Sequence, residues 1–101
     1  MKSVAVLTTA DSFAAGEVQA GVRDFTRVDR TQRGIVRMDE SAAIDDRWYG
    51  AIDDQRLVER LYTIVRGGRG YSFEFQFYAP KDEEAALEQA ARIAASVRFG
   101  P

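Results

Sequence analysis

The side chains of this chain that could carry out chemistry are carboxylates and arginines, because the sequence holds no histidine and no cysteine. The usual acid or base at physiological pH is therefore missing, as are a thiolate nucleophile and a thiolate metal site. Asp39, Glu40, Asp45 and Asp46 precede Arg47. A calcium site needs about six or more oxygens at set spacing, and no Asp-x-Asp-x-Asp-Gly loop is present. We interpret these acids as a solvated loop, and we predict no catalysis, no metal and no cofactor.

A second cluster of charge is basic. Between residues 23 and 37 five arginines stand against two aspartates. Their simplest role is to protect an exposed edge strand from unwanted pairing. Nucleic-acid binding would favour aromatic residues among the arginines, and there are none between Phe25 and Trp48. The third interpretation is an acidic protein partner, steered by a basic stripe. The candidate interaction residues here are Arg27, Arg30, Arg33 and Arg37.

The elements that would position these charges are organised around a hairpin over residues 57–78. Tyr71 to Phe77 alternates aromatic with polar residues, which only a strand places on two separate faces. Leu57 to Val65 is rich in apolar and β-branched residues, and Gly67-Gly68 supplies the positive φ values of a tight turn. An even-length turn sets the register of the two strands. The expected pairs are Arg66 with Arg69, Ile64 with Tyr71, Tyr62 with Phe73, Arg60 with Phe75 and Val58 with Phe77.

Two expectations follow from this register. Arg60 lies on the aromatic face, where an unpaired guanidinium would cost several kcal/mol, so we expect it over an aromatic ring with its head on an acid or at the sheet margin. Phe73 and Phe75 should be mostly buried beneath a helix. The only tryptophan, Trp48, should lie on the other face, as part of the core.

The remaining elements follow from periodicity and from breakers. Strands are predicted over residues 4–9, 26–32, 35–38 and 43–52, with a turn at Asp53-Asp54. One helix is predicted from Asp11 or Ser12 to about Phe25. A second begins after Pro80 with acids in its first turn, and its buried stripe is Leu87, Ala90, Ala91, Ala94 and Val97.

These elements predict an α+β fold, an antiparallel sheet of four to five strands with one amphipathic helix on each face, or an α/β/α sandwich. At 101 residues the chain, residues 1–101, is expected to be a single domain. A formal charge of −2 and a pI near 5.1 give no general reason to bind nucleic acid or an anionic membrane. No apolar run is long enough for a membrane span or a signal peptide, so we expect a cytoplasmic protein, or an exported or periplasmic domain whose signal has been removed.

The carboxyl half contains the turn Gly67-Gly68-Arg69, an aromatic strand that runs into Ala79-Pro80, and an acidic-headed helix that ends in Ser96-Val97-Arg98-Phe99. In these features it resembles the PsbP-like superfamily. That group includes photosystem extrinsic proteins, Ran-binding nuclear import factors and bacterial LpqN-type lipoproteins. The resemblance implies an antiparallel sheet between helices and a binding or accessory role without catalysis. It also implies a β-hairpin before residue 4, which this sequence does not contain.

The function expected from these features is a noncatalytic protein-interaction or accessory domain that uses a sheet edge or a helix face. The alternative is a small-ligand binding module with a pocket between sheet and helix. Val4 to Leu7 is apolar without interruption and has only Lys2 as a guard. We therefore predict that the sheet margin at Val4 and Val6 is covered by a protein partner or by a second copy of the chain, which gives a homodimer.

Overall fold

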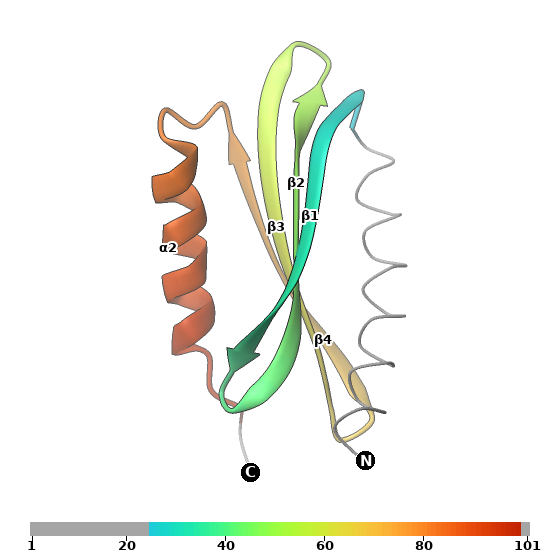
Figure 1. Ribbon diagram of the computed structural model, residues 1–101, viewed down its shortest axis with the longest axis vertical. Helices are drawn as coiled ribbons and strands as arrows, with labels where there is room; N and C mark the ends of the chain where they lie inside the picture. The colour runs from blue at the N-terminus through green and yellow to red at the C-terminus, as the bar shows by residue number, and fades with distance from the viewer. Residues whose placement is uncertain (1–24, 100–101) are drawn as a thin grey trace.

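The structure, a computed structural model, describes residues 25–99. Within them four strands form one antiparallel sheet in the order β1-β2-β3-β4, and a single helix follows (Figure 1). The elements are β1 (Arg27–Met38), β2 (Ser41–Ile52), β3 (Gln55–Arg66), β4 (Arg69–Tyr78) and α2 (Glu83–Ser96). The α+β class is thereby confirmed. The predicted strand at residues 4–9, with Val4 and Val6, and the helix preceding Phe25 lie outside the described residues.

All three hairpins turn through two residues, and this sets the register of the whole sheet. Gly67 and Gly68 have φ values of 56° and 75°, as expected for a tight turn, and Asp39 and Glu40 adopt similar values of 46° and 68°. Every pair predicted for the 57–78 hairpin is confirmed, from Arg66 opposite Arg69 to Val58 opposite Phe77.

The first strand differs from the prediction. Two short strands, 26–32 and 35–38, were expected around Arg33-Gly34, whereas β1 is one strand of 12 residues. Gly34 does not interrupt the strand. It pairs with Asp45, and the pairing with β2 is continuous from Arg30 to Met38. The pairing of β1 with β2 has one irregularity, a register shift between Val28 and Arg30. It forms a β-bulge in which Asp29 has no opposite residue on β2.

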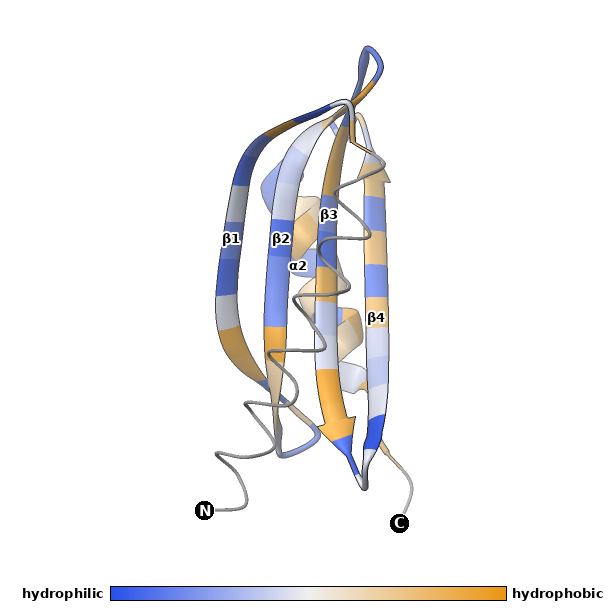
Figure 2. Cartoon of the chain, turned by 90° about the vertical axis from the view of Figure 1, so that its right-hand side faces the viewer, coloured by the Kyte–Doolittle hydropathy of each residue, from blue (hydrophilic) through white to orange (hydrophobic). Residues whose placement is uncertain are grey.

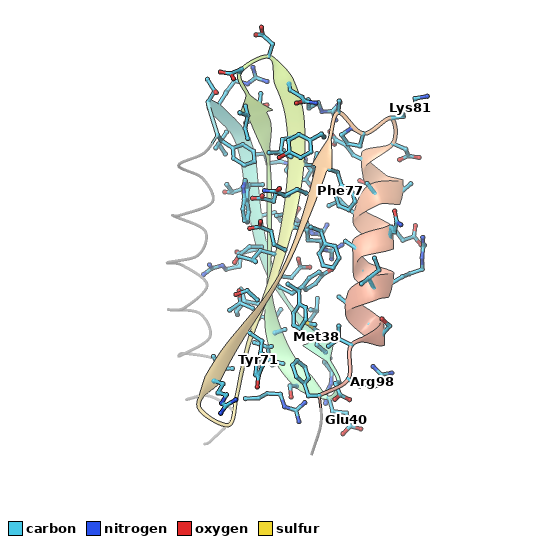
Figure 3. All side chains as sticks on the ribbon, turned by 180° about the vertical axis from the view of Figure 1, so that it is seen from behind. Met38, Glu40, Tyr71, Phe77, Lys81 and Arg98 are labelled. Carbon is cyan, nitrogen blue, oxygen red and sulfur yellow. The ribbon has the colours of Figure 1, made fainter. Side chains whose placement is uncertain are left out.

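The helix α2 packs on one face of the sheet. Its first turn is capped by Asp82, whose carboxylate accepts a hydrogen bond from the Ala85 N–H at 3.1 Å. The buried helix residues are Leu87, Ala90 and Ala94, three members of the predicted stripe. Figure 3 shows Met38 and Phe77 in the layer between the sheet and α2, near opposite ends of the helix. The small alanines let the helix approach the sheet closely.

The core is centred on β3, whose residues 57–64 are all buried. On the α2 side Tyr62 and Ile64 pack with Met38, Ala43 and Ala94. The opposite face of the sheet carries the buried apolar residues Ile44, Trp48, Leu57 and Leu61. Trp48 is thus a core residue, on the face expected for it. No helix among residues 25–99 lies on that second face.

Phe73 and Phe75 are only half-buried, although they pack against the core cluster. They were expected to be mostly covered by a helix. The reason is their position on β4, which within residues 25–99 is an edge strand with a neighbouring strand on one side.

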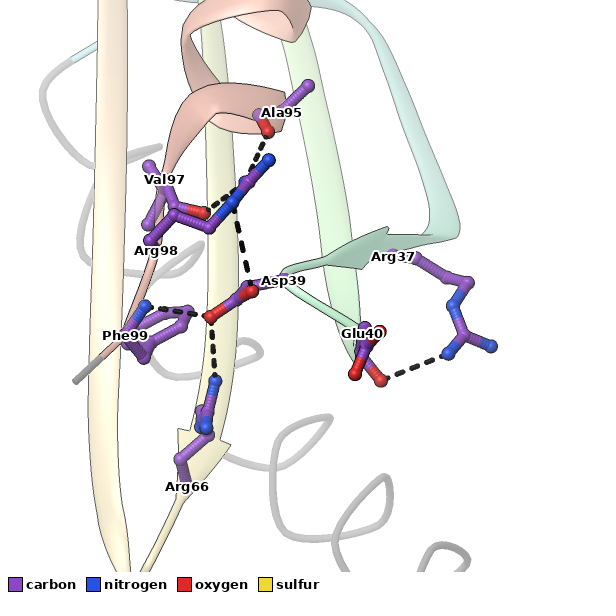
Figure 4. Close-up of polar contacts among 8 residues, drawn as sticks. All are labelled: Arg37, Asp39, Glu40, Arg66, Ala95, Val97, Arg98 and Phe99. Carbon is purple, nitrogen blue, oxygen red and sulfur yellow. Dashed lines mark hydrogen bonds and ion pairs between the residues drawn. The ribbon is translucent and has the colours of Figure 1, made fainter. Parts of the chain in front are cut away.

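The carboxyl end is attached to the sheet through Asp39 (Figure 4). The Asp39 carboxylate accepts a hydrogen bond from the Phe99 backbone N–H at 2.8 Å, and the Arg66 guanidinium contacts it at 3.4 Å. The Phe99 ring lies between Arg66, at 4.6 Å, and the ring of Tyr71, with centroids 5.3 Å apart. Phe99 therefore folds back onto the sheet, as predicted.

Replacing Asp39 by asparagine should detach this end and change the pH dependence of stability. The hydrogen bond from Phe99 lowers the pKa of Asp39, partly opposed by burial and supported by the charges of Arg98 and Arg66. A lowered pKa in the folded state means that the stabilisation is present above the unfolded pKa and is lost as pH falls through the folded value. Asparagine tolerates the positive φ of this turn.

Urea titrations between neutral and acid pH should therefore show a smaller loss of stability for Asp39→Asn than for the parent below the ordinary aspartate range. The amide resonance of Phe99 should also move towards its unfolded position. A parent protein whose Asp39 carboxyl titrates at its ordinary pKa would contradict this account of the carboxyl end.

Candidate interaction surfaces

The strand β1 forms one edge of the sheet and is the more polar of the two edges. Figure 2 shows it coloured hydrophilic along most of its length, in contrast to the alternation on β4. Nine of its 12 residues are exposed, and it carries four arginines and one aspartate. In an antiparallel edge strand alternate residues direct their N–H and C=O groups away from the sheet. Within the described sheet this edge thus combines outward-facing backbone groups with an excess of positive charge.

The four candidate arginines all lie on β1, but they have different partners. Arg27 pairs with Asp29 at 2.7 Å, and Arg33 pairs with Asp46 at 2.6 Å. These two guanidinium groups are already neutralised by carboxylates of the same chain. The other two contact neutral groups: Arg30 stacks 3.9 Å from the centre of the Tyr49 ring, and Arg37 donates to the Glu40 carbonyl oxygen at 3.1 Å.

The arginines also divide between the two faces of the sheet. Arg27 and Arg30 lie opposite Ala51 and Tyr49, on the α2 side. Arg33 and Arg37 lie on the other face, together with Ile35, which is 64% exposed. The bulge at Asp29 breaks simple alternation, so sequence spacing alone could not assign these faces. The basic cluster is therefore a strand edge with charge on both sides, and not a single stripe.

Asp45 and Asp46 are not the solvated loop residues predicted for them. Both lie within β2 and are buried, with 3% and 4% of their surface exposed. The Asp45 carboxylate accepts hydrogen bonds from Arg60 at 2.7 and 3.0 Å, while Asp46 binds Arg33. Opposite charges in the interior replace the water that these carboxylates lose. Asp39 and Glu40 do form a turn, but only Glu40 is exposed, because the Asp39 carboxylate is held by Phe99 and Arg66.

Arg60 is buried and fully engaged. Its guanidinium donates to Asp45 and, at 2.7 Å, to the Leu87 carbonyl oxygen of α2, and it lies 4.9 Å from the centre of the Tyr62 ring. The predicted acid partner of the guanidinium is confirmed, but the ring contact is made by the guanidinium over Tyr62, whereas the side-chain stem was expected to make it. The acid could have been found from the sequence: a two-residue turn at Asp53-Asp54 places Asp45 opposite Tyr62, two residue pairs from Arg60 and therefore on the same face of the sheet. This ion pair joins β2, β3 and α2, so it supports the fold.

The cavity between the sheet and α2 is small. Its volume is about 80 Å³, and it is lined mainly by Val36, Met38, Tyr62, Ala91 and Ala94. The Tyr62 hydroxyl is buried there without a hydrogen-bond partner, and burial raises the pKa of this group to about 12. Ligand sites commonly enclose about 300 to 1,000 Å³. The space has room for a water molecule or a small side chain, which is less than a metabolite needs.

The opposite edge, β4, has a different character. Its aromatic residues are half-buried on the α2 side, and its other face exposes Ser72, Glu74, Gln76 and Tyr78. Tyr78 is 52% exposed. Between Tyr71 and Tyr78 the only charged residue is Glu74, and the one basic residue of β4 is Arg69 at its first position, so this edge carries far less positive charge than β1. Sequence reasoning did not single it out, because the strand order was needed to show that β4 is an edge.

No family model, curated protein or solved structure matches this chain. Within residues 25–99 no group of histidine, cysteine, aspartate and glutamate side chains could hold a metal ion. Across the same residues no helix has the length and apolar character that crossing a membrane requires. The candidate surfaces are therefore defined by the geometry of the two sheet edges.

Proposed function

We propose that this protein is a noncatalytic protein-interaction domain that binds an extended, acidic segment of a partner along β1. The observation that carries the proposal is the edge position of this 12-residue strand, with its four arginines and one aspartate. A partner strand would satisfy the outward backbone groups of β1, and its carboxylates would complement the arginines. The positive charge of β1 is the reason that we expect the partner segment to be acidic.

The contacts on β1 indicate where such a strand would gain most. Arg37 is exposed and donates only to a neutral carbonyl oxygen among its described contacts, so its charge remains available to a carboxylate. Ile35, two residues away on the same face, exposes apolar surface. An acidic residue followed two positions later by an apolar one would match this pair. Binding by β1 would therefore be selective for a segment that carries an acidic and an apolar residue on the same face, two positions apart.

A small-ligand function has less support. The cavity between sheet and helix is about 80 Å³, and the core around it is filled by Tyr62, Met38 and the helix alanines. A full core beside an exposed strand edge favours a protein partner over a ligand.

The proposal also covers the face of the sheet opposite α2. Ile44, Trp48, Leu57 and Leu61 are buried on the face opposite α2. We propose that the amphipathic segment expected before Phe25 forms a helix on this face, which completes the α/β/α sandwich. This arrangement would agree with the resemblance to the PsbP-like superfamily and with an accessory role.

Binding to synthetic peptides tests the proposal. A labelled peptide in which glutamate is followed two positions later by valine should bind, more weakly as salt rises, and its counterpart with lysine in place of glutamate should not. Arg37→Glu should weaken binding by about tenfold, equivalent to about 1.4 kcal/mol.

The matched control is Arg92→Glu, which makes the same charge change at an exposed position of α2. Its affinity for the acidic peptide should equal that of the parent, and circular dichroism should show both variants folded. Equal binding of the two peptides, or equal losses in the two variants, would remove β1 as the binding edge.

A further inference from the structure

We propose that β4 pairs antiparallel with β4 of a second copy, across a two-fold axis at Phe75, and that this forms a homodimer with a continuous eight-stranded sheet. This inference concerns the edge opposite to the one in the proposed function, and it does not depend on that function.

The backbone of β4 is prepared for such pairing. The Ala79 N–H donates to the Arg56 carbonyl oxygen at 2.7 Å, which marks Ala79 as facing β3. In an antiparallel ladder the hydrogen-bonded positions alternate, so Phe77, Phe75 and Phe73 also bond to β3. The intervening residues, Ser72, Glu74, Gln76 and Tyr78, direct their N–H and C=O groups outward. A second strand would satisfy these groups.

The charges of the two edges decide which one can pair with itself. On β1, self-pairing brings together two strands with four arginines and one aspartate each, and like charges facing each other oppose association. On β4 the stretch from Tyr71 to Tyr78 holds a single charge, Glu74. Self-pairing is therefore disfavoured at β1 and permitted at β4, provided that Glu74 does not face its own copy.

The position of the axis follows from Glu74 and Phe99. An axis at Glu74 would place the two carboxylates directly opposite each other, whereas an axis at Phe75 places Glu74 opposite Gln76 of the second copy. Phe99 already packs on Tyr71 and Phe73, with ring centroids 5.3 and 6.3 Å apart. An axis at Phe75 pairs residues 72–78 of the two copies, which leaves Tyr71, the ring nearer to Phe99, outside the paired stretch.

In this register the aromatic residues also meet. Phe75 faces its own copy, and Phe73 faces Phe77 of the second copy. These pairs occupy the positions without interstrand hydrogen bonds, where opposing side chains approach most closely. The half-buried aromatic row would gain the neighbour that its edge position denies it in a single chain. Both β1 strands would remain at the outer edges of the sheet, so a dimer could bind two partner segments.

Sedimentation and light scattering over a concentration series test the proposal with the purified full chain. The expected result is a reversible equilibrium between monomer and a species of twice the mass, with no larger assembly because the two-fold contact is closed. A monomer at every accessible concentration would overturn the proposal and would leave β4 to a different protein or without a partner.

Charge variants test the edge and the register. Gln76→Lys places a cation opposite Glu74 of the second copy and should lower the dissociation constant at low salt. Its side chain can also remain beside Glu59, to which the Gln76 amide now donates. Glu74→Lys/Gln76→Lys places lysine opposite lysine twice and should raise the dissociation constant by about tenfold or more.

Glu84→Lys/Gln89→Lys is the matched control, because it makes the same two changes at exposed positions of α2. It should leave the dimer unchanged. A dimer that both lysine pairs weaken equally, or that Gln76→Lys does not strengthen, contradicts pairing in this register. Loss of peptide binding by Arg37→Glu does not bear on this result, so the two proposals can fail separately.

Discussion

Replacing Arg60 by methionine should lower the free energy of unfolding by about 3 to 5 kcal/mol, because it leaves the Asp45 carboxylate buried without its main counter-charge. Asp45 is 3% exposed and accepts two hydrogen bonds from Arg60. The Leu87 carbonyl oxygen on α2 would lose its donor in the same variant. Urea unfolding followed by circular dichroism would measure the loss, which is a large share of the stability of a small domain.

A double variant that also replaces Asp45 separates the effect of the lost charge pair from the effect of lost packing. In Asp45→Leu/Arg60→Met neither member of the buried pair remains; Arg47, which contacts Asp45 at 3.4 Å, is partly exposed and can turn to water. Apolar replacement of a buried ion pair is often neutral or stabilising. The double variant should therefore recover most of the stability. Arg92→Met is the control, since its ion pair with Glu88 is exposed and should contribute less than about 1 kcal/mol. An Arg60→Met protein within about 1 kcal/mol of the parent would show that this pair does not join the helix to the sheet.

Replacing Ile64 by alanine should cost about 3 to 4 kcal/mol, and more than replacing Phe75. Ile64 has no exposed surface and packs with Met38, Ala43, Tyr62 and Ala94, so its removal leaves a cavity in a site enclosed by strands and helix. Phe75 is larger, but it is half-buried on the edge strand. Its loss should cost about 2 kcal/mol, below the range of fully buried phenylalanines.

Thermal and urea unfolding of the two variants under one set of conditions would rank them. If Phe75→Ala is the more destabilised, the core extends to β4 and is not centred on β3. That result would also weaken the dimer proposed above, because it would mean that the aromatic row is already covered in a single chain.

The sequence predicted the centre of the fold well because the turn chemistry there is specific. Gly67-Gly68 permits positive φ values, and with an even-length turn each pair from Arg66–Arg69 to Val58–Phe77 follows by counting. The position of Arg60 and its need for an acid followed from the same count. Alternation and turn type were sufficient at these positions, because no distant contact competed with them.

Other features required the tertiary structure. Asp45 and Asp46 look like loop residues because carboxylates avoid the interior, and only the arrangement of Arg60 and Arg33 on neighbouring strands makes their burial favourable. The bulge at Asp29, which sorts the arginines onto two faces, has no clear signal in the sequence. The edge position of β4 depends on strand order, which hydrophobic periodicity does not report.

The central claim is that the basic edge β1 is where a partner strand binds, and backbone amide resonances of the isotope-labelled protein test it most directly. On addition of the acidic peptide, the largest shifts should fall on alternate residues of β1, and hydrogen exchange of their outward amides should slow. The resonances of α2 should remain in place. Largest shifts on α2 or around the cavity beneath it, with β1 unchanged, would contradict the account.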